Sequence, residues 1–144
     1  AQSLRGERFV EGTYRVYDRD FAVMGDLALA GSDYFGRTPV VSPDGSRVYV
    51  MAYSSASLRG GPGTPRVYVF DSSQRMVVTT NLPLLGYFDL AHFPTCNNTE
   101  YACNTRATGA ISPDGKTLFF LGDAHLVVAP IPQTLNTVQR ASLQ

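Results

Sequence analysis

The alternation of apolar and polar side chains is clearest in two segments that each predict a pair of short strands joined by a tight turn. Residues 40–51 read VVSPDGSRVYVM, and the pattern returns 70 positions later at residues 110–121 as AISPDGKTLFFL. Each copy has a short apolar run, then Ser-Pro-Asp-Gly, then a run of mostly apolar side chains. Because successive side chains of a strand point to opposite faces, a two-residue period indicates a strand. The pattern therefore predicts a repeated β-hairpin.

The turn residues of both hairpins have the chemistry that a β-turn requires. Serine, proline, aspartate and glycine in this order favour a type I turn, in which glycine supplies the left-handed position. We therefore expect Gly45 and Gly115 to have positive φ angles. We expect Asp44 and Asp114 to accept backbone amide hydrogens within the turn.

A second unit with a repeated pattern accompanies each hairpin. Residues 66–71 (RVYVFD) predict a strand, and residues 76–80 predict another strand after a short turn. Similar pairs are found at residues 14–18 with 21–24, and at residues 126–130 with 137–140 as a weaker partner. Four antiparallel strands per unit is the plan of a β-propeller blade.

The combination of a Ser-Pro-Asp-Gly hairpin with a Val-Tyr-Val-Phe-Asp strand resembles the YVTN-type and TolB-like bacterial β-propeller repeats. The resemblance covers most of residues 13–140 and is strongest at residues 40–53, 66–80 and 110–121. It implies that the Ser-Pro-Asp-Gly turn joins the two inner strands of a blade and that the Val-Tyr-Val-Phe-Asp strand comes third. It implies a fold rather than a reaction, because propellers serve in binding, scaffolding and catalysis.

We therefore expect an all-β fold, a single propeller-like segment over residues 1–144 with about two to three four-stranded antiparallel blades. The expected units are a partial blade at residues 1–32 and blades at residues 33–85 and 86–144. Closed propellers have roughly four to eight blades, so we expect the rest of a longer propeller or other protein chains, including further copies of this chain, to complete the ring. A two-sheet β-sandwich is the alternative.

Two insertions make the repeat longer than the usual blade of about 40–50 residues. One is the glycine- and proline-rich loop at residues 58–65, and the other is the long connection at residues 85–106. Long loops in compact domains commonly carry function. Apolar anchors and rim charges for a partner protein are expected on these connections, namely Tyr87, Phe88, Phe93, Tyr101, Arg59 and Arg106.

The charge balance makes nucleic acids and anionic membranes poor candidates for partners. Twelve basic and twelve acidic residues give a net charge of zero, so the chain has no long-range attraction for a polyanion. No apolar run approaches the roughly 20 residues that a membrane helix needs. Residues 1–12 do not resemble an export signal, so we expect any such signal to have been removed or to lie outside this sequence.

The two cysteines bear on the cellular compartment. Cys96 and Cys103 flank a polar hexapeptide, and paired cysteines in a polar loop suit an oxidising environment. We therefore expect a disulfide and an extracytoplasmic location, in the periplasm, at the cell surface or in the medium. Free thiols in a cytosolic protein are the alternative. Two thiols with no nearby histidine are two ligands short of a zinc site.

Candidate catalytic groups do not form a complete set, so we expect no catalytic residue, metal or cofactor. Asp89 could orient His92, but no third ligand or nucleophile accompanies them. The glycine loop lacks the Lys-Ser/Thr pair of a phosphate loop. Asp18, Asp20 and Asp26 lack the spacing of an EF-hand, and Asp18 is expected to have a turn role at the end of its strand, as is its counterpart Asp71.

The function expected from these patterns is that of a protein-interaction or scaffold module. The first alternative is part of a propeller enzyme, either an oxidoreductase or a lactonase-like hydrolase, with its active site in blades outside this chain. The second alternative is a structural subunit of an oligomeric or filamentous surface assembly. The sequence leaves open whether the protein is an enzyme, and it favours the interpretation that it is not.

Overall fold

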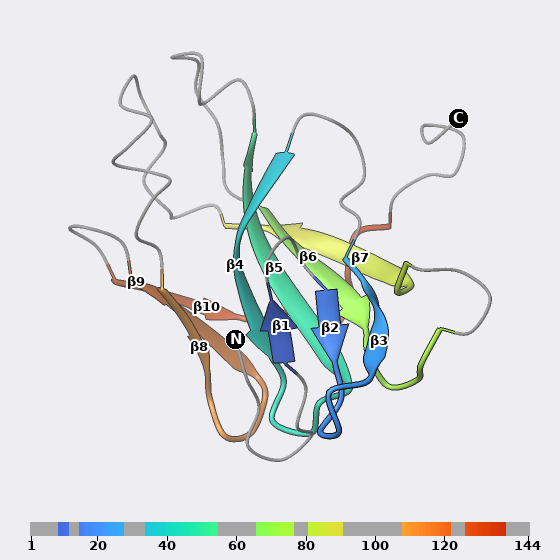
Figure 1. The fold of residues 1–144 in the computed structure, drawn as a ribbon. Helices are drawn as coiled ribbons and strands as arrows, with labels where there is room; N and C mark the ends of the chain where they lie inside the picture. Colours follow the sequence, from blue (N-terminus) through green and yellow to red (C-terminus); the bar gives the residue numbers. More distant parts are fainter. Residues whose placement is uncertain are drawn as a thin grey trace.

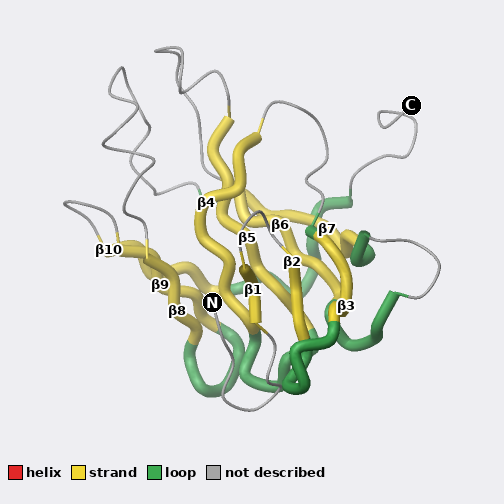
Figure 2. Tube along the Cα trace, in the orientation of Figure 1, coloured by secondary structure: helices red, strands yellow, loops and turns green. Residues whose placement is uncertain are grey.

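The computed structural model describes residues 9–11, 15–27, 34–54, 66–76, 81–90, 108–121 and 126–137, which contain strands, turns and bends but no helix (Figures 1 and 2). The strands are β1 (Phe9–Glu11), β2 (Arg15–Tyr17), β3 (Val23–Asp26), β4 (Tyr34–Val41), β5 (Arg47–Ser54), β6 (Arg66–Asp71), β7 (Leu84–Asp89), β8 (Thr108–Ile111), β9 (Thr117–Leu121) and β10 (Leu126–Pro130). Within these ranges there is accordingly no helix long and apolar enough to span a membrane.

The strands form three antiparallel sheets in which each strand pairs with its neighbours in sequence. The sheets have the orders β1-β2-β3, β4-β5-β6-β7 and β8-β9-β10. The expectation of an all-β fold built from antiparallel strands is therefore confirmed. The middle sheet has four strands, and each of the outer sheets has three among the described residues.

The middle sheet is apolar on both of its faces. Along β5, the buried side chains of Val48 and Val50 belong to one core cluster, and those of Tyr49 and Met51 belong to the other. Strand β6 alternates in the same way. Because the side chains of a strand point alternately to opposite faces, this assignment places one core on each side of the sheet.

The two outer sheets cover these two faces. On one side Val16 and Met24 from the first sheet, with Leu27 directly after β3, pack into the cluster that contains Tyr68 and Phe70. On the other side the third sheet contributes Leu118, Phe120 and Ala129, which join the cluster of Tyr49, Met51, Val67 and Val69. Figure 1 shows the middle sheet between β1–β3 and β8–β10. The described residues thus form a stack of three sheets.

The first and middle sheets repeat the same irregular pairing. Val16 lies opposite Gly25 in the pair β2–β3, and Val69 lies opposite Gly86 in the pair β6–β7. In both pairs the register shifts immediately after the valine. Strands β2 and β3 therefore occupy the places that β6 and β7 have in the middle sheet.

The bounds of two expected strands are confirmed, since β6 covers residues 66–71 and β10 covers residues 126–130. The expected fourth strand of the middle unit was wrong. Residue 76 is not in a strand, residues 77–80 lie outside the described part, and the fourth strand is β7. The expected boundary between residues 85 and 86 therefore falls inside a strand.

Two aromatic residues that were expected in a connection lie in a strand instead. Tyr87 and Phe88 belong to β7. The segment containing Tyr87 resembles a loop in sequence because Gly86 weakens the strand signal. In the structure it is held by backbone pairing with β6.

Gly86 lies against the segment that follows β10. The amide of Tyr87 donates to the carbonyl of Asn136 at 2.9 Å, and the amide of Asn136 donates to the carbonyl of Tyr87 at 2.9 Å. A Cβ atom placed on Gly86 would lie 2.5 Å from the Asn136 carbonyl oxygen and 2.8 Å from the Cβ of Leu135. Only glycine permits this approach without displacement of the backbone.

We therefore expect the substitution Gly86→Ala to lower the free energy of unfolding by about 1–3 kcal/mol, because overpacking displaces neighbouring backbone. Urea denaturation followed by circular dichroism measures the change. Leu85→Ala, at the adjacent exposed position, is the control and should cost clearly less. Equal stability of Gly86→Ala and the parent chain would show that residues 135–136 do not pack on β7.

Candidate functional site

The two ends of the stack differ in construction. At one end, which we call the turn end, lie the tight turns at residues 18–22, 42–46 and 112–116. At the opposite end, the loop end, β5 and β6 flank residues 55–65, and β7 and β8 flank residues 91–107. Cross-strand pairing fixes this assignment, since Arg47 lies opposite Asp71 near the turns and Arg66 lies opposite Asp89 at the far end.

The first Ser-Pro-Asp-Gly turn is held by a set of short hydrogen bonds. The Gly45 amide donates to the Ser42 carbonyl at 2.9 Å. One carboxylate oxygen of Asp44 accepts from the Ser42 hydroxyl at 2.7 Å, the Ser46 hydroxyl at 2.7 Å and the Ser46 amide at 3.0 Å. The Ser42 hydroxyl oxygen in turn accepts from the Arg47 amide at 3.0 Å. The aspartate thus replaces solvent for the polar groups of the turn.

The second turn repeats this arrangement. Asp114 accepts from the Ser112 hydroxyl at 2.5 Å and from the Lys116 amide at 3.0 Å, and the Thr117 amide donates to the Ser112 hydroxyl oxygen at 3.0 Å. The φ angles of Gly45 and Gly115 are +75° and +74°. The expected positive φ angles and the expected turn roles of both aspartates are therefore confirmed.

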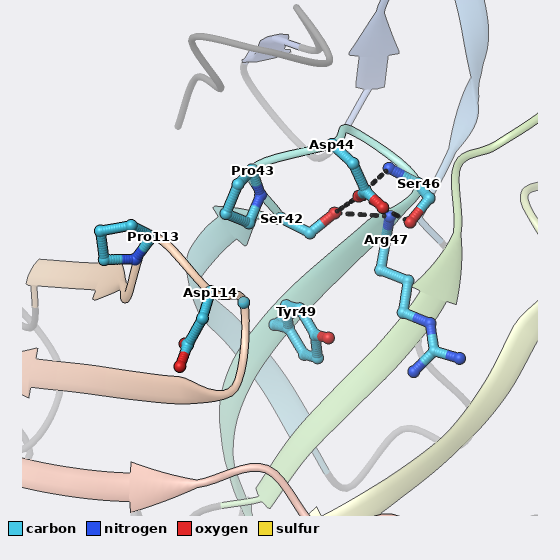
Figure 3. A pocket seen from close by; sticks show the side chains of 9 residues that line it. Ser42, Pro43, Asp44, Ser46, Arg47, Tyr49, Pro113 and Asp114 are labelled. Atoms are coloured by element: carbon cyan, nitrogen blue, oxygen red, sulfur yellow. Dashed lines mark hydrogen bonds between the residues drawn. The ribbon is translucent and has the colours of Figure 1, made fainter.

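The two turns lie beside each other and border an open hollow of about 480 Å³. A Cβ atom placed on Gly115 would lie 3.5 Å from Cδ of Pro43. Figure 3 shows Tyr49 between the two turns, with Asp44 turned toward its own serines. The residues that line the hollow are Ser42, Pro43, Asp44, Ser46, Arg47, Tyr49, Pro113, Asp114 and Gly115.

The electrostatics of the hollow favour a structural role for its carboxylates. The Ser46 amide, followed by the Ser42 and Ser46 hydroxyls, lowers the pKa of Asp44 to about 2. The Ser112 hydroxyl and the Lys116 amide lower the pKa of Asp114 in the same direction. Burial raises the pKa of Tyr49. Groups with these pKa shifts hold one protonation state at neutral pH, so they are poorly suited to general acid–base catalysis.

Two further aspartates of the turn end, Asp18 and Asp71, also accept hydrogen bonds locally. The amides of Asp20 and Ala22 both donate to Asp18 Oδ1 at 2.9 Å, and Arg75 pairs with Asp18 Oδ2 at 2.6 Å. These bonds, with that of the Ala22 amide first, lower the pKa of Asp18. Asp71 accepts from the Ser73 amide at 2.9 Å. The expected turn roles of Asp18 and Asp71 are confirmed.

No three metal-ligating side chains converge in the part of the chain that the structure describes. Of the acidic trio noted in the sequence, Asp26 pairs with Arg15 at 2.8 Å, on the first sheet. Asp18 pairs with Arg75 from the middle unit. Two of the three carboxylates that could have bound a metal cation are therefore already paired with arginines.

At the loop end the structure brings together the bases of both insertions. Arg66 is the first residue of β6 and follows one insertion, while Asp89 is the last residue of β7 and precedes the other. Nε of Arg66 lies 2.8 Å from Oδ1 of Asp89, and the guanidinium carbon lies 3.8 Å from the ring centroid of Tyr87. Arg66 and Asp89 are cross-strand partners, so this ion pair and the cation–π contact add to the backbone pairing that already joins the two strand ends.

A small crevice of about 170 Å³ lies beside this ion pair. It is bordered by the end of β7 and by β10, through Phe88, Asp89, Leu90, Val127, Val128, Ala129 and Pro130. Sequence reasoning missed Arg66 as a member of this site. The available signal was an arginine at the start of one strand and an aspartate at the end of another, but their proximity depends on the pairing of β6 with β7.

The expected contact residues have different outcomes. The prediction that Phe88 is a surface anchor was wrong, because its side chain is 7% exposed and packs in the core between the middle and third sheets. Tyr87 is half-buried beneath Arg66. Asp89 pairs with Arg66. The residues Phe93, Tyr101, Arg59, Arg106, His92, Cys96 and Cys103 lie outside the described part, so their expected roles stay predictions.

No family model and no curated protein sequence matches this chain. The interpretation of the site therefore depends on its own geometry. That geometry comprises a turn end with internally bonded carboxylates and a loop end at which the bases of two insertions are joined.

The Asp44 carboxyl should titrate with a pKa of about 2, below its ordinary value of 3.8. A lowered pKa in the folded state stabilises the fold above the ordinary pKa, and this contribution is lost as the pH falls from about 4 to about 2. We expect Asp44→Asn to cost about 1 kcal/mol at neutral pH, a value reduced by solvent screening, and to remove this part of the acid dependence. Carboxyl NMR titration and urea denaturation measure both effects.

Asp114→Asn is the matched control, because Asp114 has the same turn position but one hydrogen-bond donor fewer. We expect the control to cost less stability than Asp44→Asn. A titration of Asp44 near 3.8, or equal losses from both variants, would contradict the hydrogen-bond account.

Proposed function

We propose that this chain is a segment of an extracytoplasmic β-propeller that serves as a protein-interaction or scaffold module. The observation that carries the proposal is the stack of three antiparallel sheets in which strand pairing and turn bonding recur from sheet to sheet. A repeated sheet that packs face to face with the next sheet is the construction principle of a propeller.

The placement of the first strands favours a propeller over a two-sheet sandwich. Strands β4 and β8 begin the middle and third sheets, and they lie in contact with each other. Propeller blades converge in this way because their first strands surround a common axis. A sandwich buries one face of each sheet, whereas the middle sheet here buries both faces.

The distribution of polar groups favours recognition over catalysis. The carboxylates of Asp18, Asp44, Asp71 and Asp114 at the turn end are bonded within their own turns or to an arginine. The buried side chains of the strands make up two packed cores. Loops on a rigid scaffold are where binding surfaces commonly develop. The connections at residues 55–65 and 91–107 contain the expected loop at residues 58–65 and most of the expected connection at residues 85–106. Arg66 follows the first connection, and its cross-strand partner Asp89 lies shortly before the second, so one partner could contact both connections.

Phe93→Ala and Tyr101→Ala should each weaken partner binding by about 1–4 kcal/mol, the range for apolar anchors, with little change in melting temperature. Phe88→Ala is the matched core control and should lower the free energy of unfolding by about 3–5 kcal/mol. Thermal unfolding measures stability, and quantitative capture of partner proteins from the source organism measures binding. Unfolding of the loop variants would assign those aromatic residues to the core and reject the contact surface.

Alkylation of the unreduced protein should label neither Cys96 nor Cys103, because we propose that they form a disulfide in an oxidising compartment. After reduction both thiols should be labelled. Intact mass spectrometry of the protein purified from its source distinguishes the two states. Labelling of both cysteines without a reductant would reject the disulfide and remove the support for an extracytoplasmic location.

A further inference from the structure

The outer face of the third sheet carries apolar side chains at positions that are fully buried in the middle sheet. Leu121 and its cross-strand partner Leu126 are 53% and 62% exposed, and Val128 is 56% exposed. In the middle sheet the equivalent residues are Met51, Val67 and Val69, which are all 0% exposed. We call the set Phe119, Leu121, Leu126 and Val128 the trailing face.

The equivalence of these positions follows from the strand register. Tyr49 lies opposite Val69 and Met51 lies opposite Val67 in the middle sheet. Phe119 lies opposite Val128 and Leu121 lies opposite Leu126 in the third sheet. Since the two Ser-Pro-Asp-Gly turns fix the same starting point for β5 and β9, these pairs occupy the same places in the repeat.

The two described sheet–sheet interfaces are built in the same direction along the chain. The middle sheet contacts the third sheet through Tyr49 and Met51, and the third sheet contributes Leu118 and Phe120 to this contact. The first sheet contacts the middle sheet through Val16, and the middle sheet contributes Val48 and Val50 to this contact. Val48 and Val50 have the same places in the repeat as Leu118 and Phe120. Each internal contact therefore joins the trailing face of one sheet to the opposite, leading face of the next sheet.

A leading face is also open on the first sheet. Tyr17 and Val23 are cross-strand partners at the place of Phe70 and Leu84, which pack on the leading side of the middle sheet. Val23 is 43% exposed. Arg15 and Asp26 complete this face, and their 2.8 Å ion pair leaves it without net charge. Among the described sheets there are thus one exposed trailing face and one exposed leading face.

We propose that the trailing face of one molecule binds the leading face of a second copy of this chain, in the orientation already used between its own sheets. Exposed contiguous apolar patches on sheets mark interaction surfaces, and the internal interfaces define how the next sheet fits. This inference rests on the proposed propeller function. Two copies supply six described sheets, and this number is within the roughly four to eight blades of a closed propeller. Two head-to-tail contacts then close a pair with twofold symmetry.

The experiment is sedimentation equilibrium of the full chain and of three variants. The parent chain is expected to be a dimer. Leu126→Glu on the trailing face and Val23→Glu on the leading face should each weaken dimerisation at least roughly tenfold, because each buries a charge in an apolar contact. Leu85→Glu is the control, since Leu85 is an exposed leucine of the middle sheet, and it should leave the dimer unchanged.

Mixing the two disrupted variants provides the decisive arm. A head-to-tail pair of Leu126→Glu with Val23→Glu keeps one contact fully native, so the mixture should form a heterodimer that neither variant forms alone. This recovery also demonstrates that both variants are folded. Val128→Ser is a milder second variant of the trailing face and should weaken dimerisation less than Leu126→Glu.

Other results would overturn the proposal. A monomeric parent chain would exclude the second copy as the occupant. A dimer that Leu126→Glu dissociates but Val23→Glu does not would place two trailing faces against each other, and an open-ended polymer would exclude the closed pair. These readouts do not involve the loop aromatics, so failure of the proposed partner-binding function would be recognised separately.

Discussion

The structure depends on burial of both faces of the middle sheet. Strands β5 and β6 carry apolar side chains at consecutive positions, and Val48, Met51, Val67 and Phe70 are all fully buried. Burying a side chain of this size is worth about 1.5–3 kcal/mol, so leaving either face in water would forfeit the main stabilising term. The sheet therefore requires a layer on each side, and the first and third sheets are placed by that requirement.

Because both faces of the middle sheet are apolar, the hydrophobic pattern alone does not specify the register of its strands, and the turn does. In a sheet with one polar face, a slip by one residue exposes the apolar side chains and is strongly disfavoured. Here a slipped β5 would still present apolar side chains to both cores. The Ser-Pro-Asp-Gly turn supplies the missing specification, since the Asp44 and Ser42 bonds can form in one alignment of β4 with β5. Its recurrence at Asp114 allows the third sheet to fit the middle sheet in the same way.

The features that could be predicted from the sequence are those determined by local chemistry. The turns followed from proline, aspartate and glycine, and β6 and β10 followed from runs of strand-forming residues. Strand β7 was missed because Gly86 interrupts its pattern, and Phe88 was assigned to a surface because the segment resembled a connection. The Arg66–Asp89 pair at the candidate site depends on residues 23 positions apart, which no local pattern relates.

The bridge between Tyr87 and Asn136 has a consequence for the order of assembly during synthesis. The outer edge of β7 obtains these backbone partners from a segment that is translated almost 50 residues later. At about 5–20 residues per second, the ribosome needs roughly 2–10 s to produce that segment. During this interval the nascent middle sheet presents an uncovered strand edge, which is a template for pairing with other chains. Slow translation would therefore lengthen the exposure of this edge, and crowding of nascent chains would raise the chance that it pairs with another chain.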